Sequence, residues 1–317
     1  MSTNVIDTQE LSVYYGQHRG IIDVDLQVHE GEVFGFLGPN GSGKTTTLRV
    51  LMDIIRPIRG RAMIFGMDCQ EDGVKIRERV GYLPGELSLP PNLRGRQYLG
   101  MVNGLRDGPS DPEYQQELCA RLDLDTSRRI RDYSHGNKQK LGLVAALTAR
   151  SDLLVLDEPS SGLDPLVKKT VLEIVDEARQ DGRTVLFSSH ILSEVQEVCD
   201  RVGIIREGRL IKVESVETLT AQPFHRLLIR FGRMPDGEVF TLDGVKELNR
   251  DLDSVYLEVQ QNLPVVMERA ASYEILGIET QPVTLEEVFL AYYGKNNRKN
   301  KSASRRNGGR DGQATTL

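Results

Sequence analysis

Residues 38–46 have the composition and spacing of a loop that binds phosphate, G-x-x-x-x-G-K-[ST]. Glycines let the backbone turn tightly and bring several N–H groups close to phosphate oxygens. The Lys44 ammonium can reach the β- and γ-phosphates of a nucleoside triphosphate, and the Thr45 hydroxyl can hold Mg²⁺. The residues of this loop that we expect to contact the phosphates are Gly38, Asn40, Gly41, Ser42, Gly43, Lys44, Thr45 and Thr46.

The segments on either side of this loop have the patterns of a strand and a helix. Residues 33–37 form an apolar run, as a buried strand would. Apolar residues then recur on one helix face, at Leu48, Leu51, Met52 and Ile55, and we expect Pro57 to end that helix. Because a helix that starts at the loop adds the positive end of its dipole, this context favours phosphate binding over a chance match.

A second group of chemically capable residues follows an apolar strand at residues 153–156. Asp157 stands at the end of that strand, where its carboxylate can hold Mg²⁺ directly or through water. Glu158 comes next and can orient or deprotonate an attacking water. His190 follows another buried strand, at residues 184–187, and ligands lie at this end of the strands in open α/β sheets. The spacing predicts a metal-assisted hydrolytic site.

Composition limits the classes of protein to which the chain can belong. Its 317 residues are 39% hydrophobic and 27% charged, as in a soluble globular protein of one large or two modest domains. No apolar run approaches the roughly 18 residues of a membrane helix, and the N-terminus lacks a signal-peptide pattern. Cys69, Cys119 and Cys199 are far apart, so we expect reduced thiols of a cytosolic protein rather than disulfides or zinc ligands.

Charge is distributed unevenly along the chain. Seven basic residues and one acid follow position 294, so the rest of the chain is more acidic than the overall net charge of −6. We therefore expect no binding to nucleic acid. The basic segment is polar and rich in Gly, Asn and Ser, so residues 295–317 are expected to be a disordered tail.

The rest of the chain alternates short strands with helical patterns. Apolar runs predict strands at residues 6–15, 22–28, 62–65 and 80–83, and a hairpin that joins 202–205 to 210–213. A polar stretch at residues 96–131 predicts a helical insert. Asp164 and Pro165 predict a helix start, with Asp as N-cap and Pro at the first helical position.

Residues 133–139 resemble a family motif. They are similar to the Leu-Ser-Gly-Gly-Gln signature of ATP-binding cassette (ABC) proteins: Ser134 and Gly136 match, whereas His135 and Asn137 depart from the pattern. The order of the phosphate loop, helical insert, signature, Asp157-Glu158 pair and histidine looks like this family across roughly residues 5–220. The resemblance implies an α/β fold, a P-loop NTPase of the ABC nucleotide-binding type with an antiparallel β-subdomain and a helical subdomain.

Several site residues take their roles from this resemblance. In the family two cassettes stack head to tail, and ATP lies between the phosphate loop of one and the signature of the other. Ser134 and Gly136 would then contact the partner's ATP, and Asp164 would lie in the loop that touches the partner. His190 would contact the γ-phosphate. Tyr15 would stack on adenine, although ordinary packing of a sheet residue explains its position equally well.

The resemblance also implies the domain organisation and the partners. We expect the nucleotide-binding domain at residues 1–221 and a small α+β accessory domain at 222–294, as in many bacterial exporter ATPases. Strands at 227–231 and 255–259, and a capping box at Thr284 and Glu287, belong to that second domain. We expect the chain to hydrolyse Mg·ATP and to drive a separate integral-membrane permease from the cytoplasmic face of the membrane. A second copy of the chain is favoured over a different cassette as the partner, and the sequence leaves both this choice and the cargo open.

Three other functions remain alternatives. A soluble ABC-class ATPase of translation or chromosome handling usually has two cassettes or a coiled-coil insertion, and this chain has neither. The second alternative is a nucleotide-gated subunit with little turnover, and the third is an importer ATPase.

The nucleotide-gated alternative depends on Gly85, which stands where the family usually has a glutamine that helps to hold Mg²⁺ and water. The Glu86 carboxylate, one residue further on, or a water molecule could take the place of the missing glutamine side chain. We therefore expect the chain to bind ATP and to hydrolyse it slowly.

Overall fold

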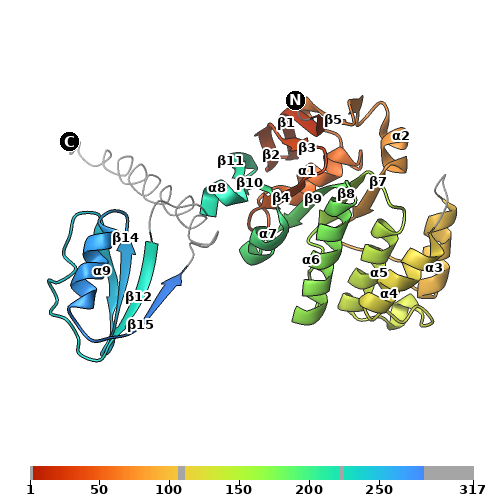
Figure 1. The fold of residues 1–317 in the computed structure, drawn as a ribbon. Helices are drawn as coiled ribbons and strands as arrows, with labels where there is room; N and C mark the ends of the chain where they lie inside the picture. Colours follow the sequence, from red (N-terminus) through yellow and green to blue (C-terminus); the bar gives the residue numbers. More distant parts are fainter. Residues whose placement is uncertain (1–2, 106–110, 221–224, 282–317) are drawn as a thin grey trace, which may run out of the picture. The chain divides into compact units, whose positions relative to one another are not determined.

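The computed structural model describes residues 3–105, 111–220 and 225–281, and the chain divides into two compact units, Met1–Val216 and Glu217–Leu317 (Figure 1). The predicted capping box at Thr284 and Glu287, the limit at residue 294 and the tail at 295–317 lie outside the described residues. The domain limits therefore stay predictions.

An antiparallel sheet begins the first unit. Its strands are ordered β2-β1-β5-β6, and β3 also pairs with β1. Their bounds are β1 (Asn4–Tyr15), β2 (His18–Val24), β3 (Gln27–His29), β5 (Arg59–Ile64) and β6 (Met67–Asp68). This sheet is the antiparallel β-subdomain that the resemblance implies.

The prediction of one strand at residues 22–28 is wrong, because the structure divides this segment between β2 and β3. Asp23 has a φ of 46°, outside the range of a regular strand. The Thr8 hydroxyl then bonds on both sides of the break, accepting from Leu26 N at 2.8 Å and donating to Val24 O at 2.9 Å. Thr8 N also donates to Leu26 O, at 2.9 Å, so the side chain adds to the backbone hydrogen bonds where β1 changes partners.

A second sheet forms the centre of the first unit. Its order is β11-β10-β4-β9-β8-β7, with parallel pairing throughout except in the hairpin β10–β11. The strands are β4 (Val33–Leu37), β7 (Val80–Leu83), β8 (Leu153–Asp157), β9 (Thr184–Ser189), β10 (Arg201–Arg206) and β11 (Arg209–Ser215). The carboxyl ends of β4, β8 and β9 consequently meet at one edge, where the sequence places its chemistry.

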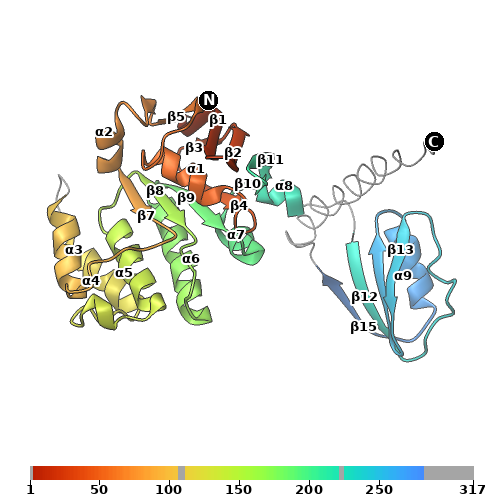
Figure 2. The same cartoon turned by 180° about the vertical axis from the view of Figure 1, so that it is seen from behind.

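Helices pack on both faces of this sheet (Figures 1 and 2). Helix α1 (Lys44–Leu51) packs between the two sheets, and its buried residues share one core with both. On the other face lie α5 (His135–Leu147), α6 (Pro165–Gln180) and α7 (Leu192–Val198). Gly35 in β4 permits this packing, because a Cβ there would lie 2.8 Å from Val195 Cγ1 of α7.

Helix α1 is shorter than predicted. It ends at Leu51, with Met52 as C-cap, and Asp53 has a φ of 54°, so the expected continuation to Ile55 is wrong. The left-handed residue turns the chain before Pro57 is reached.

The predicted helical insert contains α3 (Gly95–Gly104), α4 (Pro112–Arg121) and the short 3₁₀ helix η1 (Ile130–Asp132). Helix α2 (Gly73–Glu78) precedes it. Arg121 of α4 donates two hydrogen bonds to Glu177 of α6, at 2.6 and 2.8 Å, and so joins the insert to the central layer.

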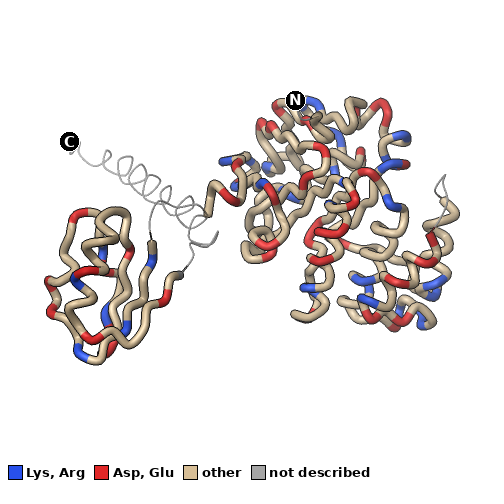
Figure 3. The backbone as a smooth tube through the Cα atoms, in the orientation of Figure 1, with Lys and Arg blue, Asp and Glu red and all other residues tan. Residues whose placement is uncertain are grey.

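Figure 3 shows basic and acidic residues interleaved along the described parts of both units.

The second unit contains an antiparallel sheet and a helix. The strand order is β13-β14-β12-β15, with β12 (His225–Phe231), β13 (Val245–Arg250), β14 (Ser254–Val259), β15 (Ile275–Gln281) and helix α9 (Leu263–Ala271). Helix α8 (Val216–Thr220) precedes them. Phe231 lies at the core of the unit, with its ring 6.2 Å from Phe240 and 6.3 Å from Tyr273. The prediction identified β12 and β14 and missed the other elements of this small α+β unit.

The three cysteines are free thiols. Burial raises the pKa of Cys69 to about 12, so this thiol stays protonated and behaves as a small apolar side chain. Within the described residues, none of the helices has the length and apolar character that a membrane crossing needs.

Candidate active site

The phosphate loop connects β4 to α1 and needs its glycines for two different reasons. Gly41 and Gly43 have φ values of 77° and 113°, which other residues adopt only with strain. Gly38 needs space instead, since a Cβ there would lie 2.5 Å from Ile205 O and 2.6 Å from Ser42 Oγ. Gly43 is the N-cap of α1 and has no side chain to cap it. The N–H groups of the first turn of α1 therefore remain available to an anion.

A cleft of about 400 Å³ lies beside this loop. It is lined by Tyr15, Arg19, Gly20, Asn40, Gly41, Ser42, Gly43, Lys44, Thr45, Thr46 and Glu158. The volume falls in the range of small-ligand sites, roughly 300–1,000 Å³. The cleft thus combines residues from β1, β2, the loop and α1 with Glu158, which follows β8. Arg19 lines it as well, and the sequence analysis did not identify this residue.

Lys44 and Glu158 form an ion pair at the floor of the cleft. Lys44 is 5% exposed, its Nζ lies 3.1 Å from Glu158 Oε1, and it donates to Gly38 O at 2.6 Å. Glu158 Oε2 lies 2.6 Å from His190 Nδ1. The predicted base, the phosphate-binding cation and the predicted histidine are thus in direct contact. A phosphate that binds Lys44 would compete with Glu158 for the same ammonium.

The two predicted metal ligands are hydrogen-bonded to each other. Thr45 Oγ1 donates to Asp157 Oδ2 at 2.7 Å, and the Ser188 hydroxyl donates to Asp157 Oδ1 at 2.5 Å. Asp157 is fully buried. A hydroxyl and a carboxylate oxygen at this separation are close to the spacing of two adjacent ligands of Mg²⁺, which are roughly 3.0 Å apart when each lies about 2.1 Å from the metal. The residues present therefore fit Mg²⁺.

Ser188 is a site residue that the sequence analysis did not single out. It pairs in register with Asp157, because β8 and β9 are adjacent parallel strands. The available signal was a hydroxyl residue at the end of the strand after the Asp157 strand.

Burial raises the pKa of Tyr82, on β7, to about 12, and the nearby Asp157 carboxylate adds to the shift. Tyr82 therefore stays protonated beside this buried carboxylate.

Tyr15 lies at the rim of the cleft. It is 46% exposed, and its hydroxyl is 3.4 Å from Thr46 Oγ1. The ring is thus available to a flat ligand, and it does not have the burial of a packed sheet residue.

The signature residues are outside this cleft. Ser134 is the N-cap of α5 and accepts from Asn137 N at 3.2 Å. Asp164 is the N-cap of α6 and accepts from Leu166 N and Val167 N, each at 3.1 Å. Gly136 and these two residues are absent from the lining of the cleft beside the phosphate loop in the described part of the chain. One chain therefore brings together the phosphate-loop side of the predicted site and leaves the signature separate.

Gly85 lies directly against Asp157. A Cβ at this position would be 2.9 Å from Asp157 Oδ2, so a side chain cannot enter without moving that carboxylate. Glu86 does not replace the missing glutamine here: its side chain is 91% exposed and lies 3.8 Å from Arg49.

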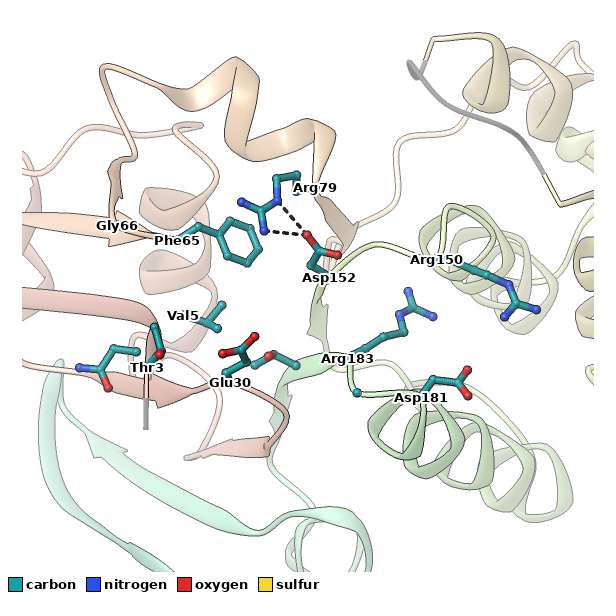
Figure 4. Close-up of a pocket in the computed structure, with 13 residues that line it drawn as sticks. Thr3, Val5, Glu30, Phe65, Gly66, Arg79, Arg150, Asp152, Asp181 and Arg183 are labelled. Atoms are coloured by element: carbon teal, nitrogen blue, oxygen red, sulfur yellow. Dashed lines mark hydrogen bonds and ion pairs between the residues drawn. The ribbon is translucent and has the colours of Figure 1, made fainter. Parts of the chain in front are cut away.

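A larger cavity, of about 630 Å³, lies at the opposite ends of the central strands (Figure 4). It is lined by Glu30, Asp152 and Arg183 among others, and it includes none of the predicted site residues. Arg79 there donates to Asp152 at 2.8 Å and covers the Phe65 ring. The smaller cleft is lined by Lys44, Thr45 and Glu158 of the predicted site, so residue chemistry rather than volume selects it as the candidate active site.

Comparisons with known proteins agree with this geometry. A family model described as "ABC transporter" matches residues 21–161. The bacitracin transport ATP-binding protein of Bacillus licheniformis is 36% identical over 215 residues, which cover 67% of this chain and 70% of the relative. The chain belongs to the ATP-binding proteins of ABC transporters. It is thus an ABC-class ATPase that acts in transport, with the cassette fold predicted above.

Other relatives extend the likeness. A daunorubicin resistance ATP-binding protein of Streptomyces coeruleorubidus is 32% identical over 318 residues, covering 96% of this chain and all of the relative. An uncharacterised ABC transporter ATP-binding protein of Nostoc is 40% identical over 200 residues, and this match spans 59% of its length. The solved structure of an ATP-binding subunit of an ABC transporter has a TM-score of 0.63 and 29% identity, covering 68% of this chain and 91% of that chain.

Proposed function

We propose that this protein is the ATPase subunit of an exporter and that it hydrolyses Mg·ATP to drive a separate integral-membrane permease. The observation that carries the proposal is that Lys44, Thr45 and Glu158 line one cleft. Asp157 is hydrogen-bonded to Thr45 there, and His190 to Glu158. Two relatives bear names of bacitracin transport and daunorubicin resistance, and these names support export.

Nucleotide binding begins with the exchange of partners at Lys44. Its ammonium leaves Glu158 and binds the β- and γ-phosphates, while the N–H groups of the loop and of the first turn of α1 donate to phosphate oxygens. Thr45 and Asp157 hold Mg²⁺, which when bound neutralises charge on the phosphates. The exposed Tyr15 ring stacks on adenine.

The exchange at Lys44 also prepares Glu158 for catalysis. Once the ammonium is on phosphate, the Glu158 carboxylate is free to take a proton from a water. As the water oxygen bonds to the γ-phosphorus, the bond to the ADP oxygen breaks and its electron pair stays on ADP. His190, 2.6 Å from Glu158, orients the carboxylate and contacts the γ-phosphate.

A second cassette completes the site. Ser134 and Gly136 are at the N-terminus of α5, which attracts an anion, yet they do not line the cleft of their own chain. We propose that they cover the nucleotide of a partner cassette, with Asp164 near the contact, and that the partner is a second copy of this chain. The complex would lie at the cytoplasmic face of the membrane.

Two measurements on the full chain test this proposal. The purified protein should release phosphate from ATP with Mg²⁺, and EDTA should stop it. Tagged protein isolated from detergent-solubilised membranes should bring with it an integral-membrane protein whose removal abolishes export. Phosphate release that is unaffected by EDTA, or association with soluble partners only, would contradict the proposal.

A second candidate is a nucleotide-gated subunit with little turnover. It is favoured by Gly85, which leaves the metal side of the cleft without a side chain from this loop. The two candidates are separated by turnover in the assembled complex: ATP binding with no phosphate release would favour the second.

A further inference from the structure

The main chain at Glu158 has an unusual conformation. Its φ is 50°, in the left-handed region that a residue with a side chain adopts only with strain. The residue follows β8 directly, so this turn decides where its carboxylate points. A conformation of this kind persists only where neighbouring groups hold it.

Hydrogen bonds hold Glu158 from two sides. On the β9 side, Glu158 N donates to Ser188 O at 3.1 Å. On the α5 side, Gln139 Nε2 donates to Glu158 O at 3.0 Å and to Pro159 O at 3.2 Å. Gln139 is 1% exposed, and its amide is therefore a buried donor shared between two consecutive carbonyl oxygens. Ser161 N also donates to Glu158 O, at 3.1 Å, so loss of the Gln139 amide would remove one of two donors to Glu158 O and the side-chain donor to Pro159 O.

Helix α5 also contacts the loop beyond Glu158. A Cβ on Gly136 would lie 2.9 Å from Gly162 O, and a Cβ on Gly162 would collide with the His135 ring. Gly162 itself has a φ of 71°. The N-terminus of α5 and the loop at 161–164 thus pack with little free space, and Gln139 lies further along the same helix.

We propose that Gln139 is a positioning residue for hydrolysis: its amide fixes the left-handed main chain of Glu158 and ties it to the helix that begins at Ser134. This rests on the proposed function, because Glu158 must be the group that acts on water. Within the described residues, the Gln139 side chain donates to the backbone oxygens of Glu158 and Pro159, and Gln139 is not among the residues that line the cleft. It therefore acts on the chemical step and not on the affinity for nucleotide.

The test separates turnover from binding in the full-length protein. In Gln139→Met, which keeps the length of the side chain and removes the donor, kcat for ATP should fall about 10-fold or more, since small misplacements can cost up to about 10²-fold. The dissociation constant for the non-hydrolysable analogue AMP-PNP should stay within about 2-fold. Gln139→Glu should lose at least as much kcat, because carboxylate oxygens would face the two carbonyls.

Gln180→Met is the matched control, since Gln180 is an exposed amide on α6 that donates to Asp176. It should leave kcat unchanged. Circular dichroism verifies folding, and Gln139→Asn, whose amide is one methylene too short, serves if Gln139→Met does not fold. A kcat equal to that of the control, or a parallel loss of AMP-PNP affinity, would overturn the inference. If wild type itself does not hydrolyse ATP, the proposed function fails instead.

Discussion

The two units of this chain bury different kinds of groups. The first unit buries polar side chains around its cleft, including Lys44, Asp157, Ser188 and Gln139. The second unit has an apolar core, and among its described residues Ser254 alone is a buried polar one. A buried polar group costs free energy unless it is hydrogen-bonded, so the polar groups of the first unit depend on the hydrogen bonds around its site. The core of the second unit consists almost entirely of apolar side chains, which stabilise a fold by packing.

Lys44→Ala should cause the largest loss in this comparison. The substitution removes the cation that we expect on the phosphates, and one charge-assisted hydrogen bond of about 3 kcal/mol corresponds to roughly 100-fold in affinity. Calorimetry with ATP should show that loss or no binding at all. Lys75→Ala, at an exposed lysine paired with Asp72, is the control and should bind normally. Wild-type affinity in Lys44→Ala would show that the cleft is not the phosphate site.

Glu158→Gln should separate binding from turnover in the first unit. Loss of a positioned base typically costs about 10²- to 10⁴-fold in rate. ATP affinity should not weaken, since the neutral amide no longer competes for Lys44. Light scattering should show an ATP-bound dimer that accumulates. Glu173→Gln, at a surface glutamate of α6 near Lys169, should behave as wild type. Normal turnover in Glu158→Gln would exclude Glu158 as the base.

Gly85→Gln should have a smaller effect on the same unit. The new Cβ would meet Asp157 Oδ2 at 2.9 Å, so we expect about a 10-fold lower turnover and a higher Mg²⁺ requirement. Glu86→Ala should be silent in the isolated protein, since this side chain is exposed. Phosphate release measured across a Mg²⁺ titration tests both. Higher turnover in Gly85→Gln would contradict this expectation. It would indicate that the missing side chain at Gly85 slows hydrolysis and that the Asp157 carboxylate can move to accommodate a glutamine.

Phe231→Ala should leave turnover unchanged while it destabilises the second unit. Removing a buried phenylalanine costs about 3–5 kcal/mol in free energy of unfolding, and Phe231 is 1% exposed. Leu252→Ala, at a 98% exposed residue, is the control and should cost little. Urea unfolding combined with an ATPase assay measures both quantities. A loss of turnover in folded Phe231→Ala protein would show that the two units are functionally coupled.

Local patterns in the sequence were enough to predict most of the catalytic unit. The glycine spacing of residues 38–46 and the apolar runs before Asp157 and His190 are properties of short segments, in which each residue depends mainly on its neighbours. The structure confirms the β4–loop–α1 order and the N-cap role of Asp164. It adds Ser134 as the N-cap of α5, which was not predicted. The second unit was harder to predict, because β13 has little alternation and an exposed character.

Only the tertiary structure decided which of these groups touch. Ser188 bonds to Asp157 because β9 lies beside β8 in register, across 31 positions of sequence. Lys44 pairs with Glu158, and Gln139 holds the backbone of Glu158, because α1 and α5 pack on opposite faces of one sheet. The break between β2 and β3 is likewise bridged by the hydroxyl of Thr8, a residue of another strand. Periodicity states which face of an element is apolar, whereas contacts between distant segments follow from strand order and packing, which a single sequence does not encode locally.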